Sequence, residues 1–202
     1  MKRKNILIAL TLLLSLTAYA QNAAQAKQIL DKAAKLITRK GGASANFTID
    51  GGASRKLSGT LYVKGNKFYA KTPQAATWYN GKTQWTYLAK SEEVNVSNPN
   101  AAQQAQMNPY TFITLYKKGY ALAMKQAGAN YQIHLKDQKK QSIQEMYVTV
   151  NKATNLPTQV RMRQNNKWST ITISNFQTKT LSDALFTFNA KNYPNAEIID
   201  LR

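Results

Sequence analysis

The chain of 202 residues has no cysteine and a single histidine, His134. Without cysteine there can be no disulfide, so the fold depends on packing alone, and no N-terminal cysteine is available for a lipid anchor. A metal site built from cysteine and histidine ligands is excluded as well, because one histidine cannot complete it. We therefore expect neither a metal nor another cofactor.

Acidic side chains are also scarce, with 9 Asp and Glu against 28 Lys and Arg. Glu92 and Glu93 are adjacent, and neighbours on a strand point to opposite faces, so the two cannot act together on one bond. A Ser-His-Asp triad would have to use His134, but no nucleophile-elbow sequence lies near it. The chain also lacks a glycine-rich phosphate loop. These absences favour binding over catalysis, and we predict that the protein is not an enzyme.

The N-terminus has the three parts of a secretory signal peptide. Lys2, Arg3 and Lys4 precede an apolar run, and the sequence Ala-Tyr-Ala ends at Ala20. The apolar run has roughly a dozen residues against the ~20 that span a membrane, so an uncleaved anchor is the less favoured alternative. Cleavage after Ala20 would leave a single exported domain over residues 21–202.

Loss of the signal peptide would leave 25 basic and 9 acidic side chains, a net charge of +16. Such a charge indicates an acidic partner or surface, or a solvated basic exterior that aids solubility. Nucleic acid is the usual partner of a basic protein, but an exported chain leaves the compartment that contains it. Lipid headgroups, polyanionic saccharides and acidic protein patches remain.

Two regions have helical character. Residues 22–40 place apolar side chains three and four apart, with a glycine pair as the C-terminal stop. One or two short helices are expected within residues 100–119, where Asn108 can cap a helix that begins at Pro109. The rest of the chain reads as β.

Short alternating segments separated by turns fill that remainder. Residues 59–88 predict four consecutive antiparallel strands, with one turn at Gly65-Asn66 and another at Asn80-Gly81, a pair typical of a type I′ turn. Strands are also expected around Phe47, at residues 94–96 and through residues 120–176, while the apolar residues 186–188 can pair or pack. About eleven or twelve strands with these turns predict a barrel or a large curved sheet.

A curved sheet that does not close, with helices over its concave face, would enclose an apolar cavity. Such a cavity suits acyl chains, because each buried methylene contributes about 0.8 kcal/mol. A dry core is the other interpretation of the same residues. We expect Phe68→Glu to abolish acyl uptake without unfolding the protein. The predicted lining is Phe47, Ile49, Leu61, Phe68, Trp78, Trp85, Met146, Val148, Met162 and Ile171, and the predicted lid residues are Leu36, Phe112 and Ile113.

Several short motifs follow one another along the chain. Residues 45–48 read ANFT, residues 59–68 read GTLYVKGNKF and residues 80–87 read NGKTQWTY. Further along come Asn108-Pro109 with Phe112, then ITISNF at residues 171–176 and FTF at residues 186–188.

In their order and spacing, these motifs resemble the LolA family of periplasmic lipoprotein carriers over nearly all of residues 21–202. Residues 45–48, 59–68 and 80–87 match the family's segments A-x-F-T, G-x-L-x-V-K-x-P-x-x-F and D-G-K-x-x-W-x-Y in turn. Asn108 to Phe112 matches its central helices, and residues 171–176 and 186–188 match its closing strands. The resemblance implies a fold that is mainly β with helices, an incomplete antiparallel barrel of about eleven strands with a helical lid over the concave face.

The resemblance also implies a function. Members bind the acyl chains of lipoproteins in a cavity that opens to accept them and closes when empty. This chain, as a monomer in the periplasm, would take lipoproteins or a related amphiphile from an inner-membrane lipoprotein-releasing ABC transporter to an outer-membrane acceptor.

One position departs from the family pattern. Well-known members have an arginine directly after the lysine of the second motif, where it holds the lid by bonding to backbone groups. Here that position is Gly65. Lys67 or Lys71 could substitute only in part, because lysine lacks the planar fork of donors. We expect lid control to differ from that of the well-studied members.

A second hypothesis is a non-catalytic cell-envelope interaction protein with a filled core, whose basic surface binds an acidic partner or polysaccharide. It predicts an affinity that collapses with salt, and no bound lipid. An enzyme, the third hypothesis, would show polar groups converging around His134.

Overall fold

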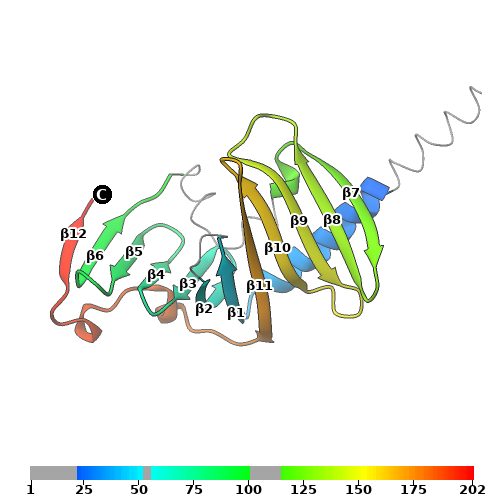
Figure 1. Cartoon of the computed structure of the whole chain (residues 1–202). Coiled ribbons are helices and arrows are strands. Elements are labelled where there is room, and N and C mark those ends of the chain that lie inside the picture. The colour runs from blue at the N-terminus through cyan, green and yellow to red at the C-terminus, as the bar shows by residue number, and fades with distance from the viewer. Residues whose placement is uncertain (1–21, 52–55, 101–114) are drawn as a thin grey trace, which may run out of the picture.

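The computed structural model describes residues 22–51, 56–100 and 115–202. Most of the regular structure in these residues belongs to one sheet of 12 strands (Figure 1). The predicted signal peptide and the predicted lid residues Phe112 and Ile113 lie outside the described residues, as do most of the predicted central helices.

The strands follow one another in an almost unbroken meander. Their order in the sheet is β12-β6-β5-β4-β3-β2-β1-β11-β10-β9-β8-β7, and every pairing is antiparallel except that of β12 with β6. The strands are β1 (Ala43–Asp50), β2 (Lys56–Lys64), β3 (Lys67–Lys71), β4 (Ala75–Tyr79), β5 (Gln84–Leu88), β6 (Glu93–Ser97), β7 (Tyr120–Ala127), β8 (Asn130–Asp137), β9 (Ile143–Asn151), β10 (Pro157–Gln164), β11 (Lys167–Thr178) and β12 (Glu197–Asp200). Within the described residues, 3-10 helices also connect the strands: η2 (Leu115–Lys117), η3 (Asp183–Phe186) and η4 (Ala190–Asn192).

The sheet is open. β1 pairs with β2 on one side and with β11 on the other, which joins the strands of the first half of the chain to those of the second. The order begins at β12 and ends at β7, so these two strands are the free edges of the sheet. The predicted class, mainly β with an unclosed sheet of about eleven strands, is confirmed.

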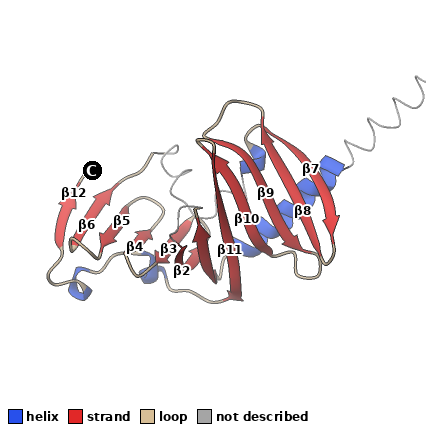
Figure 2. Ribbon diagram, viewed as in Figure 1, coloured by secondary structure: helices blue, strands red, loops and turns tan. Residues whose placement is uncertain are grey.

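A helix over residues 22–37 crosses one face of the sheet, behind β8, β9 and β10 in Figure 1 and blue in Figure 2. We call the covered face the inner face and the opposite one the outer face. The helix ends three residues before the predicted position, and Gly42, with φ of 104°, lies just ahead of β1. A positive φ is a conformation that glycine adopts without a steric penalty.

The core lies between this helix and the sheet. The helix contributes Ala26, Ile29, Leu30, Ala33, Ala34 and Ile37, all buried. Their spacing of three and four residues puts them on one side of the helix, the side that faces the sheet. Opposite them the sheet contributes Ile133, Leu135, Met146, Val148, Val150 and Val160, each fully buried in the same cluster.

The hairpins are set by local turn chemistry. The predicted turn at Gly65-Asn66 is a two-residue loop between Lys64 and Lys67, with Gly65 at φ of 59°. The second hairpin is also present, but its loop spans residues 80–83 and is not a type I′ turn. The side-chain oxygen of Asn80 accepts hydrogen bonds from two backbone N–H groups in that loop and so stabilises a wider turn.

The predicted closing strand at residues 186–188 is wrong. Phe186 ends η3, and Phe188 follows in a loop segment. Ser182 explains the helical turn, because its hydroxyl accepts a hydrogen bond from the N–H of Ala184 and caps η3. We call residues 181–193 the C-terminal arm.

Candidate functional site

Eight of the ten predicted lining residues share the inner face of the sheet. Directly paired residues on neighbouring strands point to the same face, so the register assigns each side chain. Ile49 pairs with Ile171, Ile171 pairs with Val160, and Val160 pairs with the buried Val148. The same register places the following on the inner face: Phe47, Ile49, Leu61, Phe68, Met146, Val148, Met162 and Ile171.

Burial divides these eight residues into two groups. Phe68, Met146 and Val148 are at most 3% exposed and belong to the packed core. The other five remain partly exposed in the structure, and they lie on four consecutive strands, β2, β1, β11 and β10. We call these five the apolar strip: Phe47, Ile49, Leu61, Met162 and Ile171.

A glycine shapes one end of the apolar strip. Gly59 pairs with Phe47, and a Cβ on Gly59 would lie 2.6 Å from Phe47 Cζ and 2.3 Å from the backbone oxygen of Lys71. The Phe47 ring therefore lies flat over the strand beside it, in space that only glycine leaves. The ring can fold down in this way only because the neighbouring residue has no side chain.

Trp78 and Trp85, the other two predicted lining residues, lie on the outer face. Trp78 pairs with Tyr69 and Trp85, whereas its neighbour Tyr79 pairs with Phe68 and points inward. The prediction that the two tryptophans line the inner face is therefore wrong. Trp78 and Tyr79 are both apolar, so alternation alone could not decide which of them faces inward.

The C-terminal arm covers the outer face where these tryptophans lie. The rings of Phe188 and Tyr193 meet Trp78 edge-on at 5.4 and 5.6 Å between centroids. Lys64 Nζ lies 2.9 Å and Lys67 Nζ 3.1 Å from the two carboxylate oxygens of Asp183. Sequence analysis missed this arm, because nothing in its composition says which face it covers.

The register also places the two lysines considered as partial substitutes for the family's arginine. Lys67 and Lys71 lie on the outer face with Tyr69. Lys67 is bound to the C-terminal arm. Leu36, the one predicted lid residue among those described, is partly exposed on the helix and is not part of the buried core cluster.

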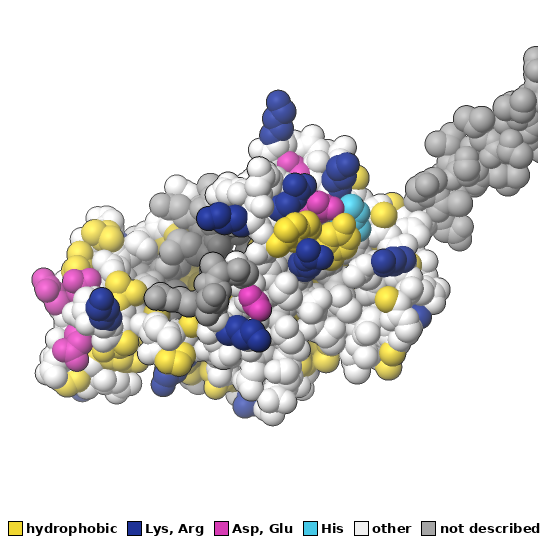
Figure 3. Space-filling view, in the orientation of Figure 1, with side chains coloured by type: hydrophobic (Ala, Val, Ile, Leu, Met, Phe, Trp, Pro, Cys, Tyr) yellow, Lys and Arg dark blue, Asp and Glu magenta, His cyan; other side chains and the backbone are white. Residues whose placement is uncertain are grey.

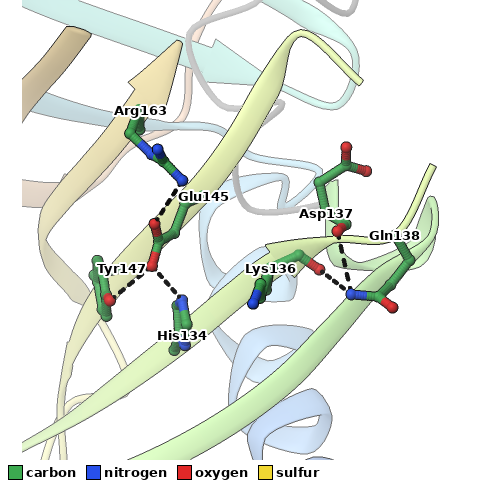
Figure 4. A network of polar contacts seen from close by, with 7 residues as sticks. All are labelled: His134, Lys136, Asp137, Gln138, Glu145, Tyr147 and Arg163. Atoms are coloured by element: carbon green, nitrogen blue, oxygen red, sulfur yellow. Dashed lines mark hydrogen bonds and ion pairs between the residues drawn. The ribbon is translucent and has the colours of Figure 1, made fainter. Parts of the chain in front are cut away.

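A separate polar cluster lies on the outer face of β8, β9 and β10 (Figure 4). Glu145 receives hydrogen bonds from Tyr147 Oη at 2.9 Å and His134 Nε2 at 2.8 Å, and pairs with Arg163 at 3.1 Å. Burial raises the pKa of Glu145, but the hydrogen bonds from Tyr147 and His134, with the charge of Arg163, outweigh it and hold the pKa below its ordinary value.

The cluster is a hydrogen-bonded network in which, among the described residues, one buried atom, Arg163 Nε, has no hydrogen-bond partner. Polar groups do converge around His134, as an enzyme would require, but within the described residues no hydroxyl that could act as a nucleophile is hydrogen-bonded to the imidazole. The rings of His134 and Tyr147 stack at 4.5 Å, and Arg161 lies 4.3 Å above Trp168. Figure 3 shows these aromatic and charged groups side by side around the histidine.

The described part of the chain contains no group of three or more His, Cys, Asp and Glu side chains that could hold a metal ion. None of the described helices combines the length and apolar character that crossing a membrane requires.

Comparison with known proteins gave one family and several solved structures. The model of the family described as outer membrane lipoprotein carrier protein LolA matches residues 16–166. No match was found among curated proteins.

Three of the solved structures illustrate the range of similarity. The chain is similar to an uncharacterized conserved protein from Thermus thermophilus, with 14% identity, a TM-score of 0.62, and coverage of 87% of this chain and 99% of that one. It also matches the LolA superfamily protein NE2245 from Nitrosomonas europaea, with 12% identity, a TM-score of 0.44, and coverage of 81% and 97%. LprF from Mycobacterium bovis matches with 9% identity, a TM-score of 0.44, and coverage of 80% and 98%.

Proposed function

Because the chain belongs to the family of outer membrane lipoprotein carrier protein LolA, we propose that it is a periplasmic, non-enzymatic carrier of acyl chains. Its cargo is a lipoprotein or a related amphiphile. It receives this cargo from an inner-membrane lipoprotein-releasing ABC transporter and delivers it to an acceptor at the outer membrane, acting as a monomer.

The apolar strip is the observation that supports this proposal. Five apolar side chains on four neighbouring strands keep part of their surface exposed beside the packed core. Partly exposed apolar side chains grouped on adjacent strands are a feature of ligand-binding surfaces. Acyl chains match such a surface, since they offer only methylene groups and need no hydrogen-bond partner.

The strip also has room to respond to a ligand. Met162 and Ile171 pack against the core cluster from its margin, where their side chains are not fully enclosed. Methionine is unbranched and fills irregular space without strain, so it can adapt to chains of different length. We therefore propose that the strip contacts the acyl chains and that the buried group beneath it keeps the sheet rigid.

Ile171→Gln tests this proposal. The amide would lie among apolar side chains and lose hydrogen bonds to water whenever an acyl chain covered it, so uptake of a fluorescent lipopeptide should fall at least about ten-fold. Thr172→Gln is the matched control, because Thr172 is exposed on the outer face of the same strand. Equal uptake by the two variants, with unchanged thermal unfolding, would contradict the assignment of the strip.

A further inference from the structure

The N-terminal helix has a second face that the acyl site does not use. Its buried side rests on the sheet, its exposed side carries Lys27, Lys32 and Lys35, and the exposed Arg39 follows two residues after its end. Lys117 of η2 joins them, since its Nζ lies 3.7 Å from a carboxylate oxygen of Asp31 on the helix. We call these five basic residues the cationic helix face.

Only one carboxylate is present on this face among the described residues, and it is already neutralised. Asp31 pairs with Lys27 at 2.8 Å and with Lys117, and it also accepts a hydrogen bond from Tyr116. Lys32, Lys35 and Arg39 make no ion pair within the described part of the chain. Three exposed cations, spaced three and four residues apart, therefore remain uncompensated.

Elsewhere among the described residues, some basic side chains are already engaged and one edge carries the opposite charge. On the outer face, Arg163 is paired with Glu145, and Arg161 lies over the ring of Trp168. At the β12 edge the charge is reversed, because Glu93 and Glu197 are direct neighbours there. Figure 3 shows Asp and Glu side chains gathered at that end of the molecule.

The position of the cationic helix face indicates what it meets. The helix lies on the inner side of the sheet, the side that also carries the apolar strip. A surface that approached the apolar strip to give or take an acyl chain would bring its headgroups toward these cations.

From this arrangement we propose that the cationic helix face docks the protein on an anionic phospholipid surface. The inference rests on the proposed carrier function and names the partner that the acyl site faces. Lysines on flexible stems suit the diffuse negative charge of lipid headgroups, which requires no fixed hydrogen-bond geometry. Each such cation near an anionic membrane strengthens binding about five-fold.

The test compares two triple variants of equal charge. Lys32→Gln, Lys35→Gln and Arg39→Gln together remove the uncompensated cations of the cationic helix face. Lys125→Gln, Lys136→Gln and Lys167→Gln together remove three exposed cations from β7, β8 and β11. Both variants lower the net charge by three, so a difference between them reports position and not total charge.

Binding is measured by flotation with vesicles of phosphatidylglycerol and phosphatidylcholine in equal parts, using protein isolated from cells. We expect the helix variant to bind about one hundred-fold more weakly than the unaltered protein, and the control variant to change by less than about five-fold. Binding should vanish on vesicles of phosphatidylcholine alone and at about 0.5 M salt, where screening extends only a few ångström. Equal binding by the two variants would overturn the proposal.

Other partners give distinct results. If the helix variant loses binding to the soluble acidic polysaccharide alginate but keeps binding to vesicles, the face recognises sugar polymers and the inference fails. Uptake of lipopeptide in the absence of vesicles is measured in parallel. Retained uptake in a helix variant that no longer floats supports the inference. If none of the three proteins takes up lipopeptide, but flotation still depends on the cations of the cationic helix face, the carrier function is rejected and the docking surface is retained.

Discussion

Asn22 shows how a single side chain can stabilise an open sheet. Its Nδ2 donates to the carbonyl of Met124 at 2.9 Å, and its Oδ1 accepts from the N–H of Met124 at 2.6 Å. Met124 lies on β7, a free edge of the sheet, where backbone groups have no neighbouring strand. The amide thus acts like a strand residue, fixes the start of the helix and blocks further pairing at that point.

Replacing Asn22 by alanine should therefore destabilise the protein. Two hydrogen bonds to a partly buried edge are lost, so the free energy of unfolding in urea should fall by about 1–2 kcal/mol. Asn22→Asp keeps the acceptor for the Met124 N–H and loses only the donor, so its loss should be smaller. If hydrogen exchange at the Met124 amide is equally slow in the unaltered protein and in both Asn22 variants, the Asn22 side chain does not stabilise this edge of the sheet.

Phe68 illustrates what burial adds to a sequence pattern. The residue is 3% exposed, and its ring contacts that of Tyr79 at 5.5 Å between centroids. A glutamate there would bury an unpaired charge in the packed core, so Phe68→Glu should unfold the protein, contrary to the expectation from sequence. The alternation in β3 correctly predicted the face of Phe68, but it could not distinguish the closed core from the apolar strip.

At the scale of elements, the C-terminal arm covers the outer face of β2, β3 and β4. Tyr62, Tyr69 and Trp78 form a ladder of stacked rings across β2, β3 and β4, at 5.7 and 5.1 Å between centroids. The arm covers one end of this ladder through Phe188 and Tyr193. Phe186 of η3 is fully buried and anchors the arm to the sheet.

Phe186→Ala should release the arm. The lost burial and the cavity left behind should lower the free energy of unfolding by about 3–5 kcal/mol. Because the arm contacts Trp78, tryptophan emission should shift to longer wavelength before global unfolding. Asp183→Asn is the comparison, since its carboxylate is 63% exposed and the loss of its solvent-screened ion pairs should change stability much less than the loss of the buried ring. Similar losses for the two variants would mean that charge, not the buried ring, holds the arm.

The helix and strands were largely predictable, because each depends on a pattern of residues close together in the sequence. Alternation and glycine turns predicted the strands between residues 56 and 88, and spacing predicted the helix over most of its length. What could not be predicted depends on distant pairing. The face of Trp78 follows from the register of β3 with β4, and the path of residues 181–193 follows from contacts with strands more than one hundred residues earlier.

For the whole molecule, charge is unevenly distributed. Of the 9 acidic side chains, several lie together at the β6 and β12 edge, where Glu93 pairs with Glu197 and Asp200 pairs with Val96. Basic side chains are spread over the helix and the remaining strands. Such an uneven distribution gives the protein a preferred orientation in the field of a charged surface, with the acidic edge turned away from an anionic one.

The same scarcity of carboxylates predicts how stability depends on pH. Glu145, whose side chain is 18% exposed, and Asp31, at 32%, both have pKa values lowered by their partners. For Asp31 the main cause is the hydrogen bond from Lys27, followed by that from Tyr116. A carboxylate whose pKa is lower in the folded state adds stability above its unfolded pKa, near 4, and that stability is lost as pH falls through the folded value.

The urea midpoint should therefore be nearly constant from about pH 7 to pH 5 and fall steeply below about pH 4. The growing excess of positive charge adds to the fall, so salt should reduce it in part. Glu145→Gln should start from a lower midpoint and lose less of it between pH 5 and pH 3, because the network that depends on the ionised carboxylate is already gone. Glu197→Gln, which removes an exposed carboxylate that makes no ion pair within the described residues, is the control and should follow the unaltered protein. If the Glu145 and Glu197 variants gave parallel curves, acid unfolding would reflect net charge alone and not the hydrogen-bonded network on β8, β9 and β10.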